Sequence, residues 1–477
     1  MKRQVFAFLA FLLTACCFAQ AKIHDVLDYG ALGDGTTDDA AAIQRAVDAC
    51  SEAGGGLVLF RAGHTYLSGP VELKSNVEVH LEATATWLAN PDESIYRLSV
   101  FGQNRGEGMM WIWCRDVENL SFSGMGTIDG NGIRFMGAEL SDSYELKPLA
   151  DPAFDPRPHV LTLVGVKKLR MRDVTIRNGA YWTVHLVGCD DAAIEGISLL
   201  NNLKIRNGDG IDIDHSRHVR ISNCHITSGD DCICLKNRRE WEQYGPTHDI
   251  TVTNCIMASR SCAIKIGSEN MDSISRVLID NCTIYGSNRG IGIQNRDEGT
   301  VTDVTFSNIT LQCRLWSDVW WGKAEPIYVT SYPRANGNHK DANWRFPKGE
   351  TVGRCGEVSR ISFNNITATS ENGCFIGGDT PDKVHHIYLN NVNLCMQKNT
   401  PFEGGQYDKR PCRGEGFVEG KVYPLYIDTA SHIYVDGLKA DWATTNFPKR
   451  GARVVESRHT DRLLLSGVSE NGVEVAQ

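Results

Sequence analysis

Val219-Arg-Ile-Ser-Asn-Cys-His-Ile226 is the stretch that decides the fold, because apolar residues alternate on both sides of a single asparagine. The pattern returns in Ile250-Thr-Val-Thr-Asn-Cys-Ile-Met257, Val277-Leu-Ile-Asp-Asn-Cys-Thr-Ile284 and Val304-Thr-Phe-Ser-Asn-Ile-Thr-Leu311. Its period of roughly 23 to 31 residues is too short for a folded domain and is typical of one turn of a three-strand coil. The sequence therefore predicts an all-β protein, a single-stranded right-handed parallel β-helix.

Each repeat places the same two residue types at one point of the turn. The asparagine is expected at a corner of the coil, bonded to the next asparagine along the stack. The residue after it is expected to be a buried thiol in three successive turns. These positions are Asn223, Asn254, Asn281, Asn308, Asn365 and Asn391, followed by Cys224, Cys255 and Cys282.

A helix is predicted near the N-terminus, ahead of the first repeats. Thr37 or Asp38 is expected to cap its start, and Gly54-Gly-Gly56 to end it. Because the first turn of a solenoid exposes its core, this helix is expected to cover it. The apolar face of the helix consists of Ile43, Ala46, Val47 and Cys50.

The chain starts with the features of an export signal. A basic start is followed by the apolar run Val5–Leu13 and the small-residue site Ala19-Gln-Ala21. We expect removal of residues 1–21, which leaves residues 22–477 as one β-helix catalytic domain. The protein is then exported, either to a periplasm or outside the cell. Lipid anchoring through Cys16 is the second interpretation of the same stretch.

Composition narrows the class of partner. The formal net charge is −9, which does not favour nucleic acid. No stretch after the signal is apolar for long enough to span a bilayer, so no transmembrane span is expected. We expect a monomer.

The residues that carry chemistry lie directly after two of the repeats. Asn207-Gly-Asp-Gly-Ile-Asp212 and Ser228-Gly-Asp-Asp-Cys-Ile233 hold four aspartates between them. In register, Asp209 and Asp231 share one column, and Asp230 lies beside it. Turns of a parallel coil stack at about 4.8 Å, so these three carboxylates are expected to surround one bond.

Clustered acids suit the hydrolysis of a glycosidic bond. That reaction needs one protonated carboxyl group for the leaving oxygen and one ionised carboxylate to activate water. Close like charges raise the pKa of at least one member, which keeps a proton available near neutral pH. We therefore expect a carbohydrate substrate. No cofactor or metal ion is expected, because the cysteines and histidines form no compact zinc-type cluster.

These motifs resemble those of a known family. Asn207-x-Asp-Gly-x-Asp212 followed by Gly229-Asp-Asp-Cys232 resembles the signature of glycoside hydrolase family 28, the polygalacturonase and rhamnogalacturonase family of pectin-lyase-like β-helices. Tyr29-Gly-Ala-x-Gly-Asp-Gly-x-x-Asp-Asp39 resembles the N-terminal cap of that superfamily. The resemblance implies hydrolysis of pectic polysaccharides or oligosaccharides at linkages that contain galacturonic acid.

The resemblance also implies roles for the three acids. Asp230 corresponds to the general acid, and Asp209 and Asp231 correspond to the residues that hold the water in an inverting displacement. For inversion, the two carboxyl groups are expected roughly 6.5 to 9.5 Å apart.

Two motifs of the family are replaced in this chain. Ser261-Cys-Ala263 stands where polygalacturonases carry Gly-His-Gly, and Gly292-Ile-Gln294 stands where they carry Arg-Ile-Lys. In the family, the Arg and Lys grip the substrate carboxylate. Lys265 and Arg289 are candidate replacements, either as contacts to a uronate or as ion partners of the Asp cluster.

Aromatic and polar residues around the acids are further candidates. The ring of Trp182 is suited to the apolar face of a sugar, although a buried structural tryptophan fits the same pattern. Loops such as Gly137–Pro158 and Pro333–Arg354 are long enough to close one end of a cleft, which favours terminal action. The candidate substrate-binding residues are Asp212, Lys265, Arg289, Gln294, His185, Trp182 and Arg296.

Three alternatives remain open. Rhamnogalacturonases also lack the family histidine and carry Cys-Ala at the place of Cys262-Ala263, so a rhamnogalacturonan hydrolase is one of them. A polysaccharide lyase would use Arg289 or Lys265 as its base, with Ca²⁺ held by acids. A non-catalytic β-helix that binds glycans is the third.

Overall fold

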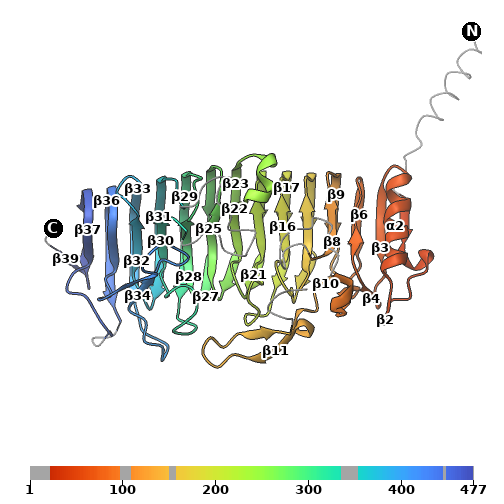
Figure 1. Ribbon diagram of the computed structural model, residues 1–477, viewed down its shortest axis with the longest axis horizontal. Helices are drawn as coiled ribbons and strands as arrows, with labels where there is room; N and C mark the ends of the chain where they lie inside the picture. Colours follow the sequence, from red (N-terminus) through yellow and green to blue (C-terminus); the bar gives the residue numbers. More distant parts are fainter. Residues whose placement is uncertain (1–21, 97–108, 150–156, 335–352, 444–446, 476–477) are drawn as a thin grey trace, which may run out of the picture.

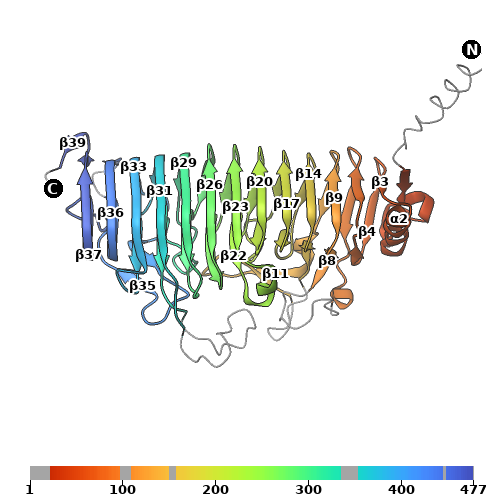
Figure 2. The same cartoon turned by 90° about the horizontal axis from the view of Figure 1, so that it is seen from above.

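The computed structural model describes residues 22–96, 109–149, 157–334, 353–443 and 447–475. The expected export signal, residues 1–21, lies outside this part. Parallel strands form one long coil, with helix α2 (Ala40–Glu52) at its N-terminal end and β37 at the other, as Figures 1 and 2 show. The parallel β-helix with an N-terminal capping helix is therefore confirmed.

Each turn contributes strands to three parallel ladders. The first ladder runs through β1 (Lys22–Asp25), β3 (Gly56–Phe60), β6 (Val77–Leu81), β9 (Glu118–Ser123), β14 (Lys167–Arg172), β17 (Asp190–Glu195), β20 (Arg217–Ser222), β23 (Thr247–Thr253), β26 (Ile274–Asp280), β29 (Val301–Cys313), β31 (Val358–Ser370), β33 (Val384–Met396), β36 (Leu425–Trp442) and β37 (Val455–Ser466).

The second ladder runs through β2 (Asp34–Asp38), β4 (Thr65–Ser68), β7 (Thr86–Ala89), β10 (Thr127–Asp129), β15 (Thr175–Arg177), β18 (Ser198–Leu200), β21 (His225–Ser228), β24 (Ile256–Ser259) and β27 (Thr283–Ser287), then through the later halves of the long strands β29, β31, β33 and β36 to β38 (Ser469–Glu470). It forms the side of the coil that precedes the acidic motifs in each turn.

The third ladder runs through β5 (Val71–Glu72), β8 (Met110–Arg115), β13 (His159–Val164), β16 (Val184–Val187), β19 (Ile211–Asp214), β22 (Ile233–Asn237), β25 (Cys262–Asn270), β28 (Arg289–Asn295), β30 (Ile327–Ser331), β32 (Cys374–Gly378) and the start of β36. Two small antiparallel hairpins project from the coil: β11 (Met136–Glu139) with β12 (Leu146–Pro148), and β34 (Gln406–Asp408) with β35 (Phe417–Glu419).

Burial differs between the ladders. In β20, buried Val219 and Ile221 alternate with residues that face solvent, as expected for a strand with one face on the core. Every residue of β19, β22 and β28 is buried, including those that point away from the core. The outer face of the third ladder is therefore covered, and charged side chains on it have been taken out of water.

The asparagine corner is confirmed. All six residues have a positive φ between 53° and 57°, a left-handed conformation that asparagine tolerates better than most residues. The amide of Asn391 donates to the amide oxygen of Asn365 at 2.9 Å, and Asn365 donates to Asn308 at 3.0 Å. The ladder of amides therefore links turns that are up to 57 residues apart in the sequence.

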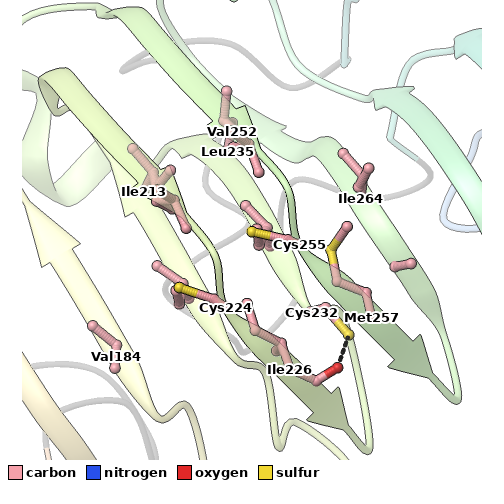
Figure 3. Packing of buried hydrophobic residues seen from close by; sticks show 14 of the residues in the cluster. Val184, Ile213, Cys224, Ile226, Cys232, Leu235, Val252, Cys255, Met257 and Ile264 are labelled. Atoms are coloured by element: carbon pink, nitrogen blue, oxygen red, sulfur yellow. Dashed lines mark hydrogen bonds between the residues drawn. The ribbon is translucent and has the colours of Figure 1, made fainter. Parts of the chain in front are cut away.

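The column of thiols is also confirmed. Cys224, Cys255 and Cys282 are free and at most 2% exposed. Figure 3 shows Cys224 and Cys255 among apolar side chains of the core, and Cys232 bonded to the Ile226 carbonyl. The cysteines therefore fill the core of the coil.

Helix α2 covers the first turn with the predicted apolar face, which is buried. The predicted cap is wrong, because the N-cap residue is Asp39 and not Thr37 or Asp38. Asp38 accepts a bond from the Ala40 amide, whereas Thr37 bonds to Asp34. Asp39 accepts from the Leu32 and Gly33 amides and so ties the preceding loop to the helix start. In the described part of the chain, we find no helix that is both long and apolar enough to cross a membrane.

Candidate active site

The register of the third ladder brings the acids together as the repeat predicted. Ile211 pairs with Ile233, and Ile233 with Ile264, so Asp209, Asp231 and Cys262 occupy equivalent positions on successive turns. The next outward column is equally regular, because Asp212 pairs with Cys234 and Cys234 with Lys265.

Three carboxylates converge at the start of β19 and β22. One oxygen from each of Asp209, Asp230 and Asp231 lies within 4.8 Å of the others. Of all the described residues, these form the one group of three or more His, Cys, Asp or Glu side chains close enough to share a metal ion. This separation of single oxygens is shorter than the roughly 6.5 to 9.5 Å expected between the carboxyl groups of an inverting pair.

Asp231 has two partners for its negative charge. The Lys265 ammonium lies 2.7 Å from Oδ2, and the Ser261 hydroxyl donates to Oδ1 at 3.0 Å. Both partners come from the next turn of the coil, at the start of β25. The carboxylate of Asp231 is therefore held in place by one charged and one neutral donor.

Asp230 lies in the opposite electrostatic situation. Burial, followed by the adjacent charge of Asp231, raises the pKa of Asp230 to about 6. Its Oδ2 accepts a long bond, 3.3 Å, from the Asn207 amide. Asp230 is therefore suited to holding a proton at mildly acidic pH.

Asp209 and Asp212 are more deeply buried. Burial and the neighbouring acids hold the pKa of Asp209 well above its usual value, and its Oδ1 has no hydrogen-bond partner among the described residues. Burial raises the pKa of Asp212 to about 7, and neither of its oxygens has such a partner in the same part of the chain. The Lys236 ammonium lies 3.4 Å from Asp212 Oδ1.

Trp182 and His185 form the floor one turn before Asp209 and Asp212. The Lys236 ammonium lies 4.6 Å from the centre of the Trp182 ring, a cation–π geometry. His185 Nε2 lies 3.2 Å from Asp214 Oδ2, and burial lowers the pKa of His185 despite this carboxylate. Both rings are at most 5% exposed, so both shape the floor of the site.

Three candidates lie away from the acids. Arg289, Gln294 and Arg296 are 4%, 4% and 0% exposed. Each donates to a backbone carbonyl of the segment Asp408–Arg410: Arg289 to Asp408 at 2.7 Å, Arg296 to Lys409 at 2.8 Å, and Gln294 to Arg410. These side chains hold a covering segment, and Arg289 also pairs with Glu325 at 3.1 Å.

Lys236 and Glu269 are contributors that the candidate set leaves out. Lys236 is 3% exposed, and its ammonium lies between Asp212 and Glu269, 3.7 Å from the latter. Lys236 lies two residues after Cys234, so strand alternation puts it on the same face as the acids. That alternation is the sequence signal that identifies it.

The sequence profile described as "Glycosyl hydrolases family 28" matches residues 56–315, and one described as "Rhamnogalacturonase A/epimerase, pectate lyase-like" matches residues 23–84. A "Probable polygalacturonase" of Vitis vinifera is 27% identical over 372 residues, 73% of each chain. A "Probable endo-xylogalacturonan hydrolase A" of Aspergillus niger is 26% identical over 58% of this chain and 66% of its own.

Solved structures show the same fold. An exopolygalacturonase from Thermotoga maritima superposes with a TM-score of 0.64 at 21% identity, covering 79% of this chain and 88% of its own. A family 28 exopolygalacturonase from Yersinia enterocolitica gives 0.63 at 21% identity, covering 96% and 80%. Since the family profile spans more than half of the sequence, this protein is a glycosidase that belongs to glycosyl hydrolases family 28.

Proposed function

We propose that this glycosidase hydrolyses pectic polysaccharides or oligosaccharides at linkages that contain galacturonic acid, with inversion at the anomeric carbon. The observation that carries the proposal is the unequal environment of two adjacent acids. Asp231 has Lys265 and Ser261 as partners, whereas burial and the charge of Asp231 raise the pKa of Asp230 to about 6. Two neighbouring carboxyl groups are thereby suited to opposite protonation states.

In this mechanism, Asp230 donates its proton to the leaving glycosidic oxygen. Asp231, which is paired with Lys265, takes the proton of the attacking water, and Asp209 helps to hold that water. The convergence of the three carboxylates within 4.8 Å supports the action of all three at one anomeric centre. In an inverting displacement, the water attacks from the face opposite the leaving group.

Lys265 supports the base Asp231 through a direct ion pair. Its ammonium is 2.7 Å from Asp231 and its side chain is 16% exposed, so one cation contacts the base and also borders the cleft. Ser261 contributes the second bond to Asp231 from the position of a family glycine. We assign Lys265 primarily to an ion pair with the base Asp231, and secondarily to contact with a uronate of the substrate.

The other candidate residues form two groups, according to what their side chains contact. Asp212, Trp182 and His185 lie on the floor beside the acids, and we assign them to substrate positioning together with Lys236. Arg289, Gln294 and Arg296 are assigned to supporting the Asp408–Arg410 segment, because their donor groups are bonded to it.

We further propose that residues 22–477 form a single catalytic domain of an exported, periplasmic or extracellular monomer. One continuous hydrophobic core supports the single domain, because it runs from Val26 to Val468. Cleavage after Ala21 follows from the basic and apolar pattern of the first residues. Lipid anchoring at Cys16 remains the alternative form of export, and the mass of the mature N-terminus distinguishes the two.

Rhamnogalacturonan hydrolysis is the second candidate. The match of the N-terminal region to a rhamnogalacturonase-type profile and the Cys262-Ala263 pair in place of a histidine favour it. A rhamnogalacturonan backbone offers fewer carboxylates than a homogalacturonan, which fits the loss of two carboxylate-binding cations at Gly292 and Gln294.

The test is a panel of defined substrates: homogalacturonan, rhamnogalacturonan and xylogalacturonan oligosaccharides. New reducing ends are measured, and the anomer of the first product is followed by NMR. We expect the inverted anomer from one galacturonate-containing substrate. A product that absorbs in the ultraviolet and forms only with Ca²⁺ would instead identify a lyase, and tight binding without turnover would identify a glycan-binding β-helix.

A further inference from the structure

The outer face of the third ladder changes abruptly between neighbouring turns. At β22 and β25 it carries the partly exposed Asp230 and Lys265. From β28 onward, a segment of another part of the chain crosses it. We call residues Asp408–Arg413 the strap.

The strap is bonded to the floor along its length. The Asp408 carbonyl accepts from Arg289 at 2.7 Å and from the Tyr328 hydroxyl at 2.6 Å. The Lys409 and Arg410 carbonyls accept from Arg296 and Gln294, at the far end of β28. Arg413 donates its amide to the Pro333 carbonyl at 2.7 Å, beyond the end of β30. The strap therefore spans the width of the ladder, from one corner of the coil to the other.

A charge network fixes the start of the strap. The Asp408 carboxylate accepts from the Gly322 amide at 3.0 Å and pairs with Arg410 at 2.8 Å. Arg410 in turn lies over the Trp321 ring, with 4.9 Å between its guanidinium carbon and the ring centre. The strap thus continues into the loop that precedes β30.

Behind the strap, the ladder is filled with aromatic rings. Tyr407 stacks on Phe375 with ring centres 4.9 Å apart, and on Tyr426 at 5.3 Å. Tyr328 completes this cluster, and all four rings are at most 3% exposed. Figure 1 shows β34 lying by β32 at this end of the coil. Beyond the strap there is no open floor for sugar residues on the described strands β30 and β32.

The strap is close to the acids. β28, on which it lies, is two turns after β22, which places it roughly 10 Å beyond Asp231 along the axis. A second segment lies beside the acids: Arg260, one residue before Ser261, donates to the Ser143 and Tyr144 carbonyls of the turn between β11 and β12. A polymer bound along the axis therefore meets a wall shortly after the cleavage point.

We propose that the strap closes the substrate cleft at its C-terminal end and restricts this enzyme to chain ends, from which it releases a short product. This inference rests on the proposed pectic hydrolase function. The loops expected from the sequence to close the cleft lie partly outside the described residues, and the strap comes from a different segment.

Product analysis of the whole protein tests the inference. Homogalacturonan and rhamnogalacturonan are digested to low conversion, product sizes are resolved by chromatography with mass detection, and viscosity is followed in parallel. We expect one short product from the first time point and little loss of viscosity per bond cleaved. A ladder of product sizes at low conversion would overturn the inference and leave the hydrolase function standing. Absence of new reducing ends on every pectic substrate would overturn both.

A variant with a shortened strap tests directly whether the strap limits the enzyme to chain ends. The Lys409 amide donates to the Gly416 carbonyl at 2.7 Å, so replacing Arg410–Glu415 by two glycines keeps the neck of the hairpin. This variant is expected to give several product sizes at low conversion. Gln294→Ala, which removes one bond to the strap, is expected to act in the same direction more weakly. Glu415→Ala, at the exposed tip, is the matched control.

Thermal unfolding is recorded for each variant. A folded, shortened variant that still releases the single short product would contradict the role of the strap. If that variant does not fold, the product pattern of the unmodified enzyme decides the inference by itself.

Discussion

Two neighbouring regions of the third ladder bury charge in opposite ways. In the acid cluster, burial holds the pKa of Asp209 well above its usual value and raises the pKa of Asp212 to about 7. In the strap network two to three turns further on, Asp408 is equally buried, yet Arg410 and Arg289 overcome burial and lower its pKa. The same coil thus holds buried acids with raised pKa values close to a buried ion network that lowers the pKa of its carboxylate.

The difference lies in the number of partners. Asp408 accepts from Arg410 and from the Gly322 amide, whereas both oxygens of Asp212 lack a hydrogen-bond partner among the described residues. A buried carboxylate without partners is costly, and such groups are found where catalysis or binding requires them. The comparison teaches which charges support the fold and which are available for the reaction.

Asp230→Asn alters the acid cluster and has the largest expected effect. Loss of the proton donor should lower kcat by about 10²- to 10⁴-fold with unchanged thermal stability. Reducing-end release and a melting curve measure this. Asp303→Asn, which alters an exposed pair with Arg360, is the matched control and should retain full activity. Unchanged turnover in Asp230→Asn would remove Asp230 from the mechanism.

Glu325→Gln disrupts the ion network under the strap. Glu325 is fully buried and pairs with Arg289, so neutralising it removes the carboxylate that is in direct contact with a buried guanidinium. We expect a loss of about 3–5 kcal/mol in the free energy of unfolding. Denaturant unfolding measures the change. A loss below about 1 kcal/mol would show that the network is dispensable for stability.

Lys265→Met tests the link between base and acid. Lys265 lowers the pKa of Asp230, against burial and the charge of Asp231, so its removal should raise that pKa further above about 6. The basic limb of the kcat/KM profile should move to higher pH, and kcat/KM should fall by roughly tenfold, or about 1.4 kcal/mol. Lys265→Arg should restore the profile. A purely structural role would change activity without moving the limb.

Asp212→Asn concerns the pH dependence of stability. Because the folded-state pKa of Asp212 is raised to about 7, the unfolded chain binds fewer protons at this site between about pH 4 and pH 7. Asp212 therefore contributes stability at low pH that is lost as the pH rises through about 7. Relative to Asp212→Asn, the unmodified protein should lose on the order of 2 kcal/mol across this window. Parallel curves for the two proteins would contradict the assignment.

Much of the fold follows from the sequence because a repeat constrains its own register. The spacing of Asn223 and Asn254 equals that of the paired Ile233 and Ile264, and the shared Asp-x-Ile motif aligns Ile211 with Ile233. The convergence of Asp209 with Asp231 needs no further information, since stacked turns are separated by one strand spacing. The same alternation of residues along the strand predicts that Lys236 lies on the face of the acids.

The contacts of Arg289, Gln294 and Arg296 could not be predicted in this way. Their places in the repeat follow those of the acids, yet their donor groups bond to Asp408–Arg410, more than 110 residues later in the chain. No periodicity encodes this contact, because the strap belongs to a hairpin outside the repeat.

The sequence alone determined the coil, the column of acids and the family motifs, because each depends on short, repeated spacings. The tertiary structure decided which buried charges are paired and where the cleft ends. Those properties depend on a long connection that folds back over the ladder, and its position is set by side-chain contacts between segments that are distant in sequence.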